Sequence, residues 1–68
     1  MATIYKKVGD NIRKLRKRAG LSQEDVSSKA KIDLTTVNEI EGGLRNPSLK
    51  TLHKISNALK ADLKELFN

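Results

Sequence analysis

The chain has 68 residues and a mass of 7.6 kDa, which leaves room for one small core and excludes a multidomain enzyme. Apolar residues make up 37% of it and recur at regular spacing, so we expect a folded chain rather than a disordered one. It contains no Cys, which excludes disulfides and a Cys-ligated zinc and suits a reducing compartment. Neither a signal peptide nor a membrane-spanning apolar run is visible. These features predict a single cytoplasmic domain over residues 1–68.

Charge is the most informative part of the composition. The chain carries 14 Lys and Arg against 8 Asp and Glu, a net charge of +6 with a pI near 9.9. Residues 1–20 have a net charge of +6, residues 21–42 of −3 and residues 43–68 of +3. A small basic domain favours nucleic acid as its partner. The acidic middle of the chain then needs an explanation.

The first segment has the apolar spacing of an amphipathic helix. Its apolar positions recur at steps of three and four and are Ile4, Val8, Ile12, Leu15 and Ala19. This pattern predicts a helix over residues 5–19, ended by Gly20. Five basic residues between positions 13 and 18 cover the rest of its circumference, as either a solvated face or a phosphate-binding one.

Two short helices joined by a tight turn are predicted next. Ser22, followed by Asp25, is an N-terminal capping signal for a helix over 23–30. Asp33 is expected to cap a third helix that ends near Glu41, before a pair of glycines. Two helices separated by about three residues in a basic domain indicate a helix-turn-helix at about 22–42.

The C-terminal third predicts two further helices. Ser48 begins one with the apolar stripe Leu49, Leu52, Ile55 and Leu59, and Asp62 with Glu65 begins a short last one. No segment alternates apolar and polar residues as a strand would. We therefore expect an all-α fold of five helices.

The third helix has one apolar and one polar face. The core side is expected to comprise Val37, Ile40 and, if the helix continues, Leu44. Thr35 and Glu39 lie opposite, and Leu34 lies at the edge of the core side, where it is either a core residue or an apolar contact to a base. Short polar side chains suit a helix laid in the major groove of DNA, although an ordinary solvated face would look the same.

The acids of the middle segment have mostly structural explanations. Glu41 falls beside the core, where an unpaired carboxylate would be costly, and Arg16 is the best-placed partner for it. Asp25, Asp33 and Asp62 lie at helix N-termini, where they can accept backbone hydrogen bonds. Glu39 alone remains directed at the expected groove, where it would read a base or be repelled by phosphates.

Several motifs in fixed order resemble the Cro/C1-type (XRE) helix-turn-helix family. They are Leu-Arg at 15–16, Gly-Leu-Ser-Gln at 20–23, Thr-x-x-x-Glu-Ile-Glu-x-Gly at 35–43, Arg-Asn-Pro-Ser-Leu at 45–49 and Asp-Leu-Lys-Glu-Leu-Phe at 62–67. The resemblance implies a lambda-repressor-like transcription regulator that binds a palindromic operator in double-stranded DNA as a homodimer, as phage-type regulators and restriction–modification controller proteins do. No enzyme activity, cofactor or small-molecule ligand is implied.

The resemblance also implies roles for individual residues. Base-reading positions are Leu34, Thr35 and Glu39, with Thr36 and Asn38 beside them. Phosphate-contacting positions are Ser22, Gln23, Gly43, Leu44, Arg45 and Asn46, and Gln23 can also brace the third helix. Arg16 and Glu41 match the family's structural ion pair. For the dimer interface the last helix offers Leu66 and Phe67, with Phe67 either facing a partner or covering the core.

Three departures and one alternative accompany the resemblance. Lys31 and Lys60 stand where the family often has Gly, so either they adopt a left-handed conformation or the turns differ. Leu34 stands where Arg or Gln is common, so no operator sequence is transferred. The alternative is a protein-interaction module that keeps the fold, suggested by the sparse recognition face.

His53 is the single His and has no partners at metal-ligand spacing.

Overall fold

The computed structural model describes residues 3–68 and confirms the all-α class, with no strand in that range. Its elements are α1 (Ile4–Arg18), α2 (Gln23–Ala30), α3 (Leu34–Glu41), α4 (Leu49–Leu59) and the 3-10 helix η1 (Leu63–Phe67). The predicted helix ends agree to within one residue for the first three. The predicted fifth helix is present as a short 3-10 helix, so the structure has four α-helices and one 3-10 helix in the described residues.

Side-chain caps explain where most helices begin. The hydroxyls of Thr3, Ser22 and Ser48 each accept a hydrogen bond from a backbone N–H in the first turn of their helix. The carboxylate of Asp25 in turn accepts from the N–H of Ser22 at 2.8 Å, which completes a capping box. Asp33 is the exception, since it occupies the cap position of α3 but its side chain makes no capping hydrogen bond. Asp33 therefore occupies the expected cap position of α3, but the backbone hydrogen bond expected of its side chain was wrong.

Both lysines that replace glycine end their helices in the left-handed conformation. Lys31 has φ 58° and ψ 49° after α2, and Lys60 has φ 55° and ψ 41° after α4. The turns thus keep a glycine-like backbone although a Cβ disfavours it by roughly 1–2 kcal/mol. The first of the two alternatives for these positions is confirmed.

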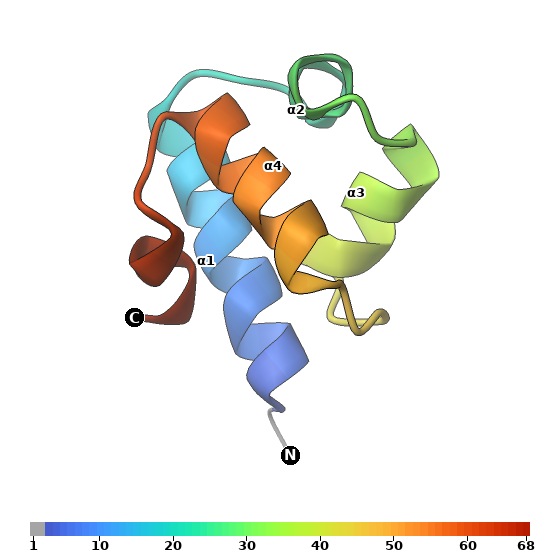
Figure 1. Cartoon of the computed structure of the whole chain (residues 1–68), viewed down its shortest axis with the longest axis vertical. Helices are drawn as coiled ribbons and strands as arrows, with labels where there is room; N and C mark the ends of the chain where they lie inside the picture. The colour runs from blue at the N-terminus through green and yellow to red at the C-terminus, as the bar shows by residue number, and fades with distance from the viewer. Residues whose placement is uncertain (1–2) are drawn as a thin grey trace.

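The helices surround one small core, to which every element contributes (Figure 1). The buried apolar residues are Val8, Ile12, Val26, Ala30, Val37, Ile40, Leu52, Ile55, Leu59 and Leu66. The long helix α1 packs against α3 and η1, and α4 packs against α2 and η1. This arrangement leaves one side of α2 and α3 facing outward.

Helices α1 and α3 approach each other unusually closely at Gly9. A Cβ placed on Gly9 would lie 2.4 Å from the carbonyl oxygen of Ile40 and 2.6 Å from that of Glu41. Only a residue without a side chain fits there, so Gly9 sets the distance between the two helices. This role was not predicted.

The C-terminal segment is tied to α1 by one side chain. The amide nitrogen Nδ2 of Asn11 donates hydrogen bonds to the backbone oxygens of Leu66 at 3.0 Å and of Asn68 at 2.9 Å. These bonds satisfy carbonyls that a short 3-10 helix leaves unpaired. Across residues 3–68, no helix is both long and apolar enough to cross a membrane.

Candidate nucleic-acid interface

Helix α3 presents a mixed polar face to solvent. Val37, Ile40 and Glu41 are buried, and they fix which side of the helix is turned outward. Thr35 and Asn38 are exposed, whereas Thr36 and Glu39 are half-buried. The candidate base-reading residues thus share one accessible surface.

Two leucines near the ends of α3 are more exposed than their wheel positions predicted. Leu34 is 43% exposed, so of its two alternatives the core residue is contradicted and the apolar contact to a base stays a prediction. Leu44 is 76% exposed rather than part of the core side, because α3 ends at Glu41 and the chain turns at Gly43, where φ is +74°. Both leucines therefore add apolar surface beside the polar face.

On its inner side α3 ends in a buried ion pair. Arg16 donates from Nε to Oε2 of Glu41 at 2.7 Å and from Nη2 to Oε1 at 3.1 Å. Its Nη1 donates to the carbonyl oxygen of Leu21 at 3.0 Å, and the Glu41 side chain is fully buried. The expected bidentate pair is present, and it joins α1, the turn before α2 and the end of α3.

The surroundings of Glu41 keep its carboxylate ionised. Burial alone would raise its pKa, but hydrogen bonds from Arg16 and Gln23 and the positive charges of Arg16 and Arg13 outweigh that effect. The pKa of Glu41 is therefore lowered from its ordinary value. Arg13 contributes from a more distant position, with Nε 3.6 Å from Oε1.

Gln23 connects the buried pair to the exposed face. Its Nε2 donates to Oε1 of Glu41 at 3.1 Å, and its Oε1 accepts from Nδ2 of Asn38 at 3.3 Å. The side-chain amide of Gln23, at the start of α2, therefore contacts both the buried Glu41 and the exposed Asn38 of α3. Ser22 beside it is exposed, and its hydroxyl caps α2.

The loop after α3 returns the chain to the exposed face of the helix. The N–H of Leu44 donates to the carbonyl oxygen of Glu39 at 2.9 Å, and Arg45 follows directly. Nε of Arg45 lies 2.6 Å from Oε1 of Glu39. A candidate phosphate-contacting residue and a candidate base-reading residue are therefore bound to each other, which the sequence analysis missed.

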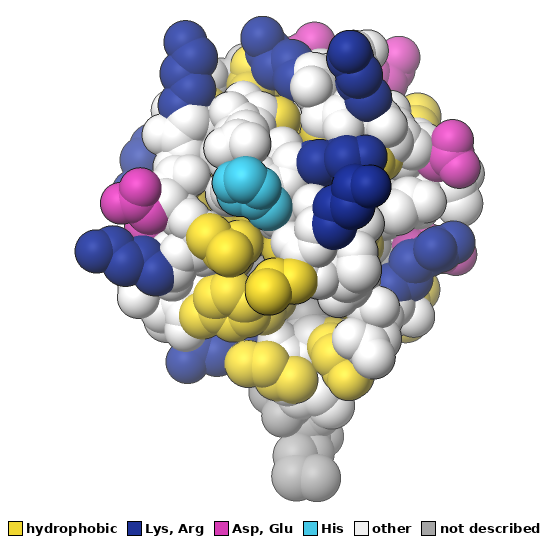
Figure 2. Space-filling view, viewed as in Figure 1, with side chains coloured by type: hydrophobic (Ala, Val, Ile, Leu, Met, Phe, Trp, Pro, Cys, Tyr) yellow, Lys and Arg dark blue, Asp and Glu magenta, His cyan; other side chains and the backbone are white. Residues whose placement is uncertain are grey.

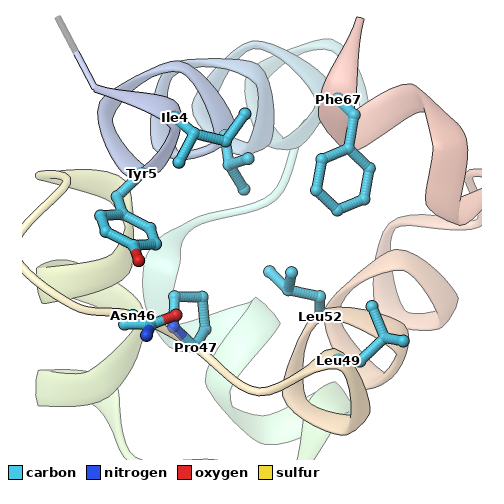
Figure 3. Close-up of a pocket in the computed structure, with 8 residues that line it drawn as sticks. Ile4, Tyr5, Asn46, Pro47, Leu49, Leu52 and Phe67 are labelled. Atoms are coloured by element: carbon cyan, nitrogen blue, oxygen red, sulfur yellow. The ribbon is translucent and has the colours of Figure 1, made fainter.

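A hydrophobic surface lies outside α3, since none of the residues that line it belongs to that helix. An open pocket is formed by the start of α1, the loop before α4, the first turn of α4 and the chain end (Figure 3), and its lining residues are Ile4, Tyr5, Val8, Asn46, Pro47, Leu49, Leu52 and Phe67. Hydrophobic side chains also gather in the lower part of the face seen in Figure 2. Phe67 is 41% exposed, whereas Leu66 is fully buried in the chain's own core. Leu66 is therefore not available to a partner, and its expected place in a dimer interface was wrong.

Within residues 3–68, no group of three or more His, Asp or Glu side chains could hold a metal ion. Of the five basic residues expected around the outer side of α1, four are exposed, namely Arg13, Lys14, Lys17 and Arg18, whereas the Arg16 side chain is only 12% exposed. Two helices at a tight turn, an exposed polar face and a basic surface describe a helix-turn-helix domain.

A helix-turn-helix family model matches residues 12–66. The chain belongs to the Cro/C1-type helix-turn-helix family. Across its full length this helix-turn-helix chain is 42% identical to control protein C.MunI from a Mycoplasma species, covering 93% of that protein. Over 88% of its length it is 34% identical to control protein C.BamHI from Bacillus amyloliquefaciens, covering 75% of that protein.

A solved structure agrees with the fold of this helix-turn-helix chain. The restriction–modification controller protein C.AhdI from Aeromonas hydrophila superposes with a TM-score of 0.90 at 38% identity. The match covers 93% of this chain and 96% of C.AhdI. The expected family and the expected kind of relative are both confirmed.

Proposed function

We propose that this protein regulates transcription by binding a specific sequence in double-stranded DNA, with α3 in the major groove. The observation that carries the proposal is the exposed face of α3, whose inner side is fixed by the buried Glu41. A helix held this firmly can present short side chains to base edges. Family membership and the similarity to named controller proteins support the same function.

Base reading is proposed for the exposed residues at the start of α3. Thr35 offers a hydroxyl to a base edge and a methyl to thymine, and Leu34 offers an apolar contact. Thr36 and Asn38 lie beside them on the same helix. Asn38 already donates one amide hydrogen to Gln23, so its second amide hydrogen and its Oδ1 are left for a base edge.

Phosphate contacts are proposed on both sides of α3. Ser22 and Gln23 begin α2, where N–H groups and the positive end of the helix dipole favour an anion. Gly43, Leu44, Arg45 and Asn46 form the loop on the other side, with Arg45 supplying the charge. These contacts position the protein and supply affinity without reading sequence.

We propose a homodimer that binds a palindromic operator and uses the apolar pocket surface as its interface. Ile4, Tyr5, Leu49 and Phe67 are all exposed around the pocket, and burying them would be favourable. Phe67→Ala should lower the dimer fraction in sedimentation, with normal unfolding as the control. An undiminished dimer would remove Phe67 from the interface.

Selection of bound sequences from random duplex DNA tests the proposed function. Recovery of a palindrome supports a regulator, whereas recovery of no sequence supports the alternative of a protein-interaction module. Transcription from a reporter that carries the recovered sequence should then change when the protein is expressed. The similarity to C.AhdI extends the proposal to control of restriction–modification genes.

Substitution of Thr35 tests the assignment of α3 as the reader. Thr35→Ala should change the sequence preference at about one base pair per half-site, by about 1–3 kcal/mol, because one base contact is lost. Arg45→Ala should weaken all sequences alike. Equal losses on every sequence for both variants would contradict the assignment.

A further inference from the structure

Glu39 and Arg45 form an ion pair at the edge of the proposed DNA-binding face. Nε of Arg45 and Oε1 of Glu39 are 2.6 Å apart, and their side chains are 49% and 36% exposed. Among residues 3–68 this is the one hydrogen bond that the Arg45 side chain makes. Its two terminal nitrogens, Nη1 and Nη2, therefore keep their hydrogens available.

The backbone turn after α3 brings Arg45 back beside Glu39. Gly43 adopts φ +74°, and a Cβ there would lie 2.8 Å from Cα of Lys6. The hydrogen bond from the N–H of Leu44 to the carbonyl oxygen of Glu39 closes the turn at 2.9 Å. The turn therefore places Arg45 beside the side chain of Glu39.

The position of Glu39 in α3 also favours a nearby cation. The last turn of α3 contains no basic residue, and the negative end of the helix dipole disfavours a carboxylate there. Close phosphates would repel the same carboxylate if it stood alone on a DNA-binding surface. A guanidinium that binds it removes both penalties.

We infer that Glu39 acts on DNA through Arg45, as a positioning residue that fixes the guanidinium toward a phosphate oxygen, rather than as a reader of bases. One side of the guanidinium is held by the carboxylate, and the terminal nitrogens make the phosphate contact. Pre-ordering a long side chain lowers the entropy lost when it binds. The inference rests on the proposed DNA binding and assigns the role of one residue within it.

Two substitutions of Glu39 separate positioning from charge. Glu39→Gln keeps an oxygen that can accept from Nε of Arg45 but removes the charge, whereas Glu39→Ala removes both. With a mixed-sequence duplex as the probe, Glu39→Ala should bind about threefold to tenfold more weakly than Glu39→Gln, the factor expected of one hydrogen bond. The difference should be similar on any selected sequence, because a phosphate contact carries no sequence information.

The same comparison in an Arg45→Ala background is the decisive control. The difference between Gln and Ala at position 39 should disappear there, while thermal unfolding stays alike for the two variants. Equal affinities of Glu39→Gln and Glu39→Ala would overturn the inference, as would a difference that survives in Arg45→Ala. A change of preference confined to one base pair would make Glu39 a base reader instead.

Failure of the proposed function would look different. Wild-type protein that binds neither mixed nor selected duplexes would remove DNA binding itself, and the inference with it. The inference alone would fail under a different result. In that case wild-type protein binds DNA and Arg45→Ala binds it more weakly, but Glu39→Gln and Glu39→Ala bind it equally well.

Discussion

Helix α3 ends with two glutamates two residues apart, and each is bound by an arginine from elsewhere in the chain. Glu41 points inward and is fully buried with Arg16 of α1, whereas Glu39 points outward and shares a half-exposed pair with Arg45. Buried pairs are costly to break, while exposed pairs contribute little to stability. The comparison teaches that two glutamates of one helix can serve different ends: the buried Glu41 stabilises the fold, and the exposed Glu39 is available for DNA binding.

The largest expected effect comes from breaking the inner pair. Glu41→Ala should lower the free energy of unfolding by about 3–5 kcal/mol, because it leaves Arg16 mostly buried without its partner. Urea unfolding measures this loss, which approaches the whole stability of many domains of this size. A loss below about 1 kcal/mol would show that the inner pair resembles the outer one after all.

Gly9 tests the inner side of α3 in a second way. Gly9→Ala should cost about 1–3 kcal/mol of unfolding free energy, because its Cβ would meet the backbone oxygens of Ile40 and Glu41. Gly42→Ala is the matched control, since its Cβ would have no neighbour nearer than 3.5 Å. Similar unfolding midpoints for the two variants would contradict the close contact between α1 and α3.

The pH dependence of stability sharpens the contrast. The folded state lowers the pKa of Glu41 from its ordinary value of 4.5, so the unfolded state binds more protons as the pH falls. The contribution of Glu41 is complete above about pH 4.5 and is lost as the pH drops through the lowered pKa. Asp10, whose pKa is lowered by its hydrogen bond from Lys6, and Asp25, whose pKa is lowered by Ser22, act in the same direction.

Glu41→Gln isolates the part that belongs to Glu41. The difference in unfolding free energy between wild type and Glu41→Gln should become smaller as the pH falls through the lowered pKa of Glu41. Urea unfolding at several pH values measures this difference. A gap that stays constant would mean that Glu41 titrates alike in the folded and unfolded states.

The smallest expected effect on stability comes from the outer pair. Glu39→Ala should change the unfolding free energy by less than about 1 kcal/mol, because an exposed ion pair is lost while an unfavourable charge at the helix end is removed. Its thermal midpoint should stay close to that of wild type. A loss of unfolding free energy as large as that of Glu41→Ala would contradict the proposal that Glu41 stabilises the fold and Glu39 does not.

The inner and outer faces of α3 could largely be predicted from the sequence, because they depend on the spacing of residues along one helix. The wheel positions of Val37 and Ile40 oriented α3, and the same wheel required a cation for Glu41 close to Arg16. A left-handed conformation of Lys31 and Lys60 was one of two alternatives raised by comparison with a family that often has glycine there, and the structure decided between them. Each of these inferences needs only spacing along the chain or a fixed motif.

The unpredicted features depend on how distant segments meet. The pair of Glu39 and Arg45 exists because the chain reverses at Gly43, and the contact at Gly9 exists because two helices cross there. The wheel placed Leu44 inside by continuing a helix that in fact ends at Glu41. The sequence placed both Leu66 and Phe67 at the expected interface, whereas in the structure Leu66 is fully buried and Phe67 is 41% exposed.

The most direct test of the account measures DNA affinity against salt for Arg45→Ala, with Arg18→Ala as the matched control. Arg18 is also exposed, but it lines a hollow with Glu65 and Asn68 beside the chain end. We expect Arg45→Ala to keep its stability, to bind every duplex more weakly and to reduce the salt slope by about one, because one phosphate contact is lost. Arg18→Ala should change the slope less. An unchanged affinity and slope for Arg45→Ala would contradict the claim that the outer side of α3 and its loop bind DNA.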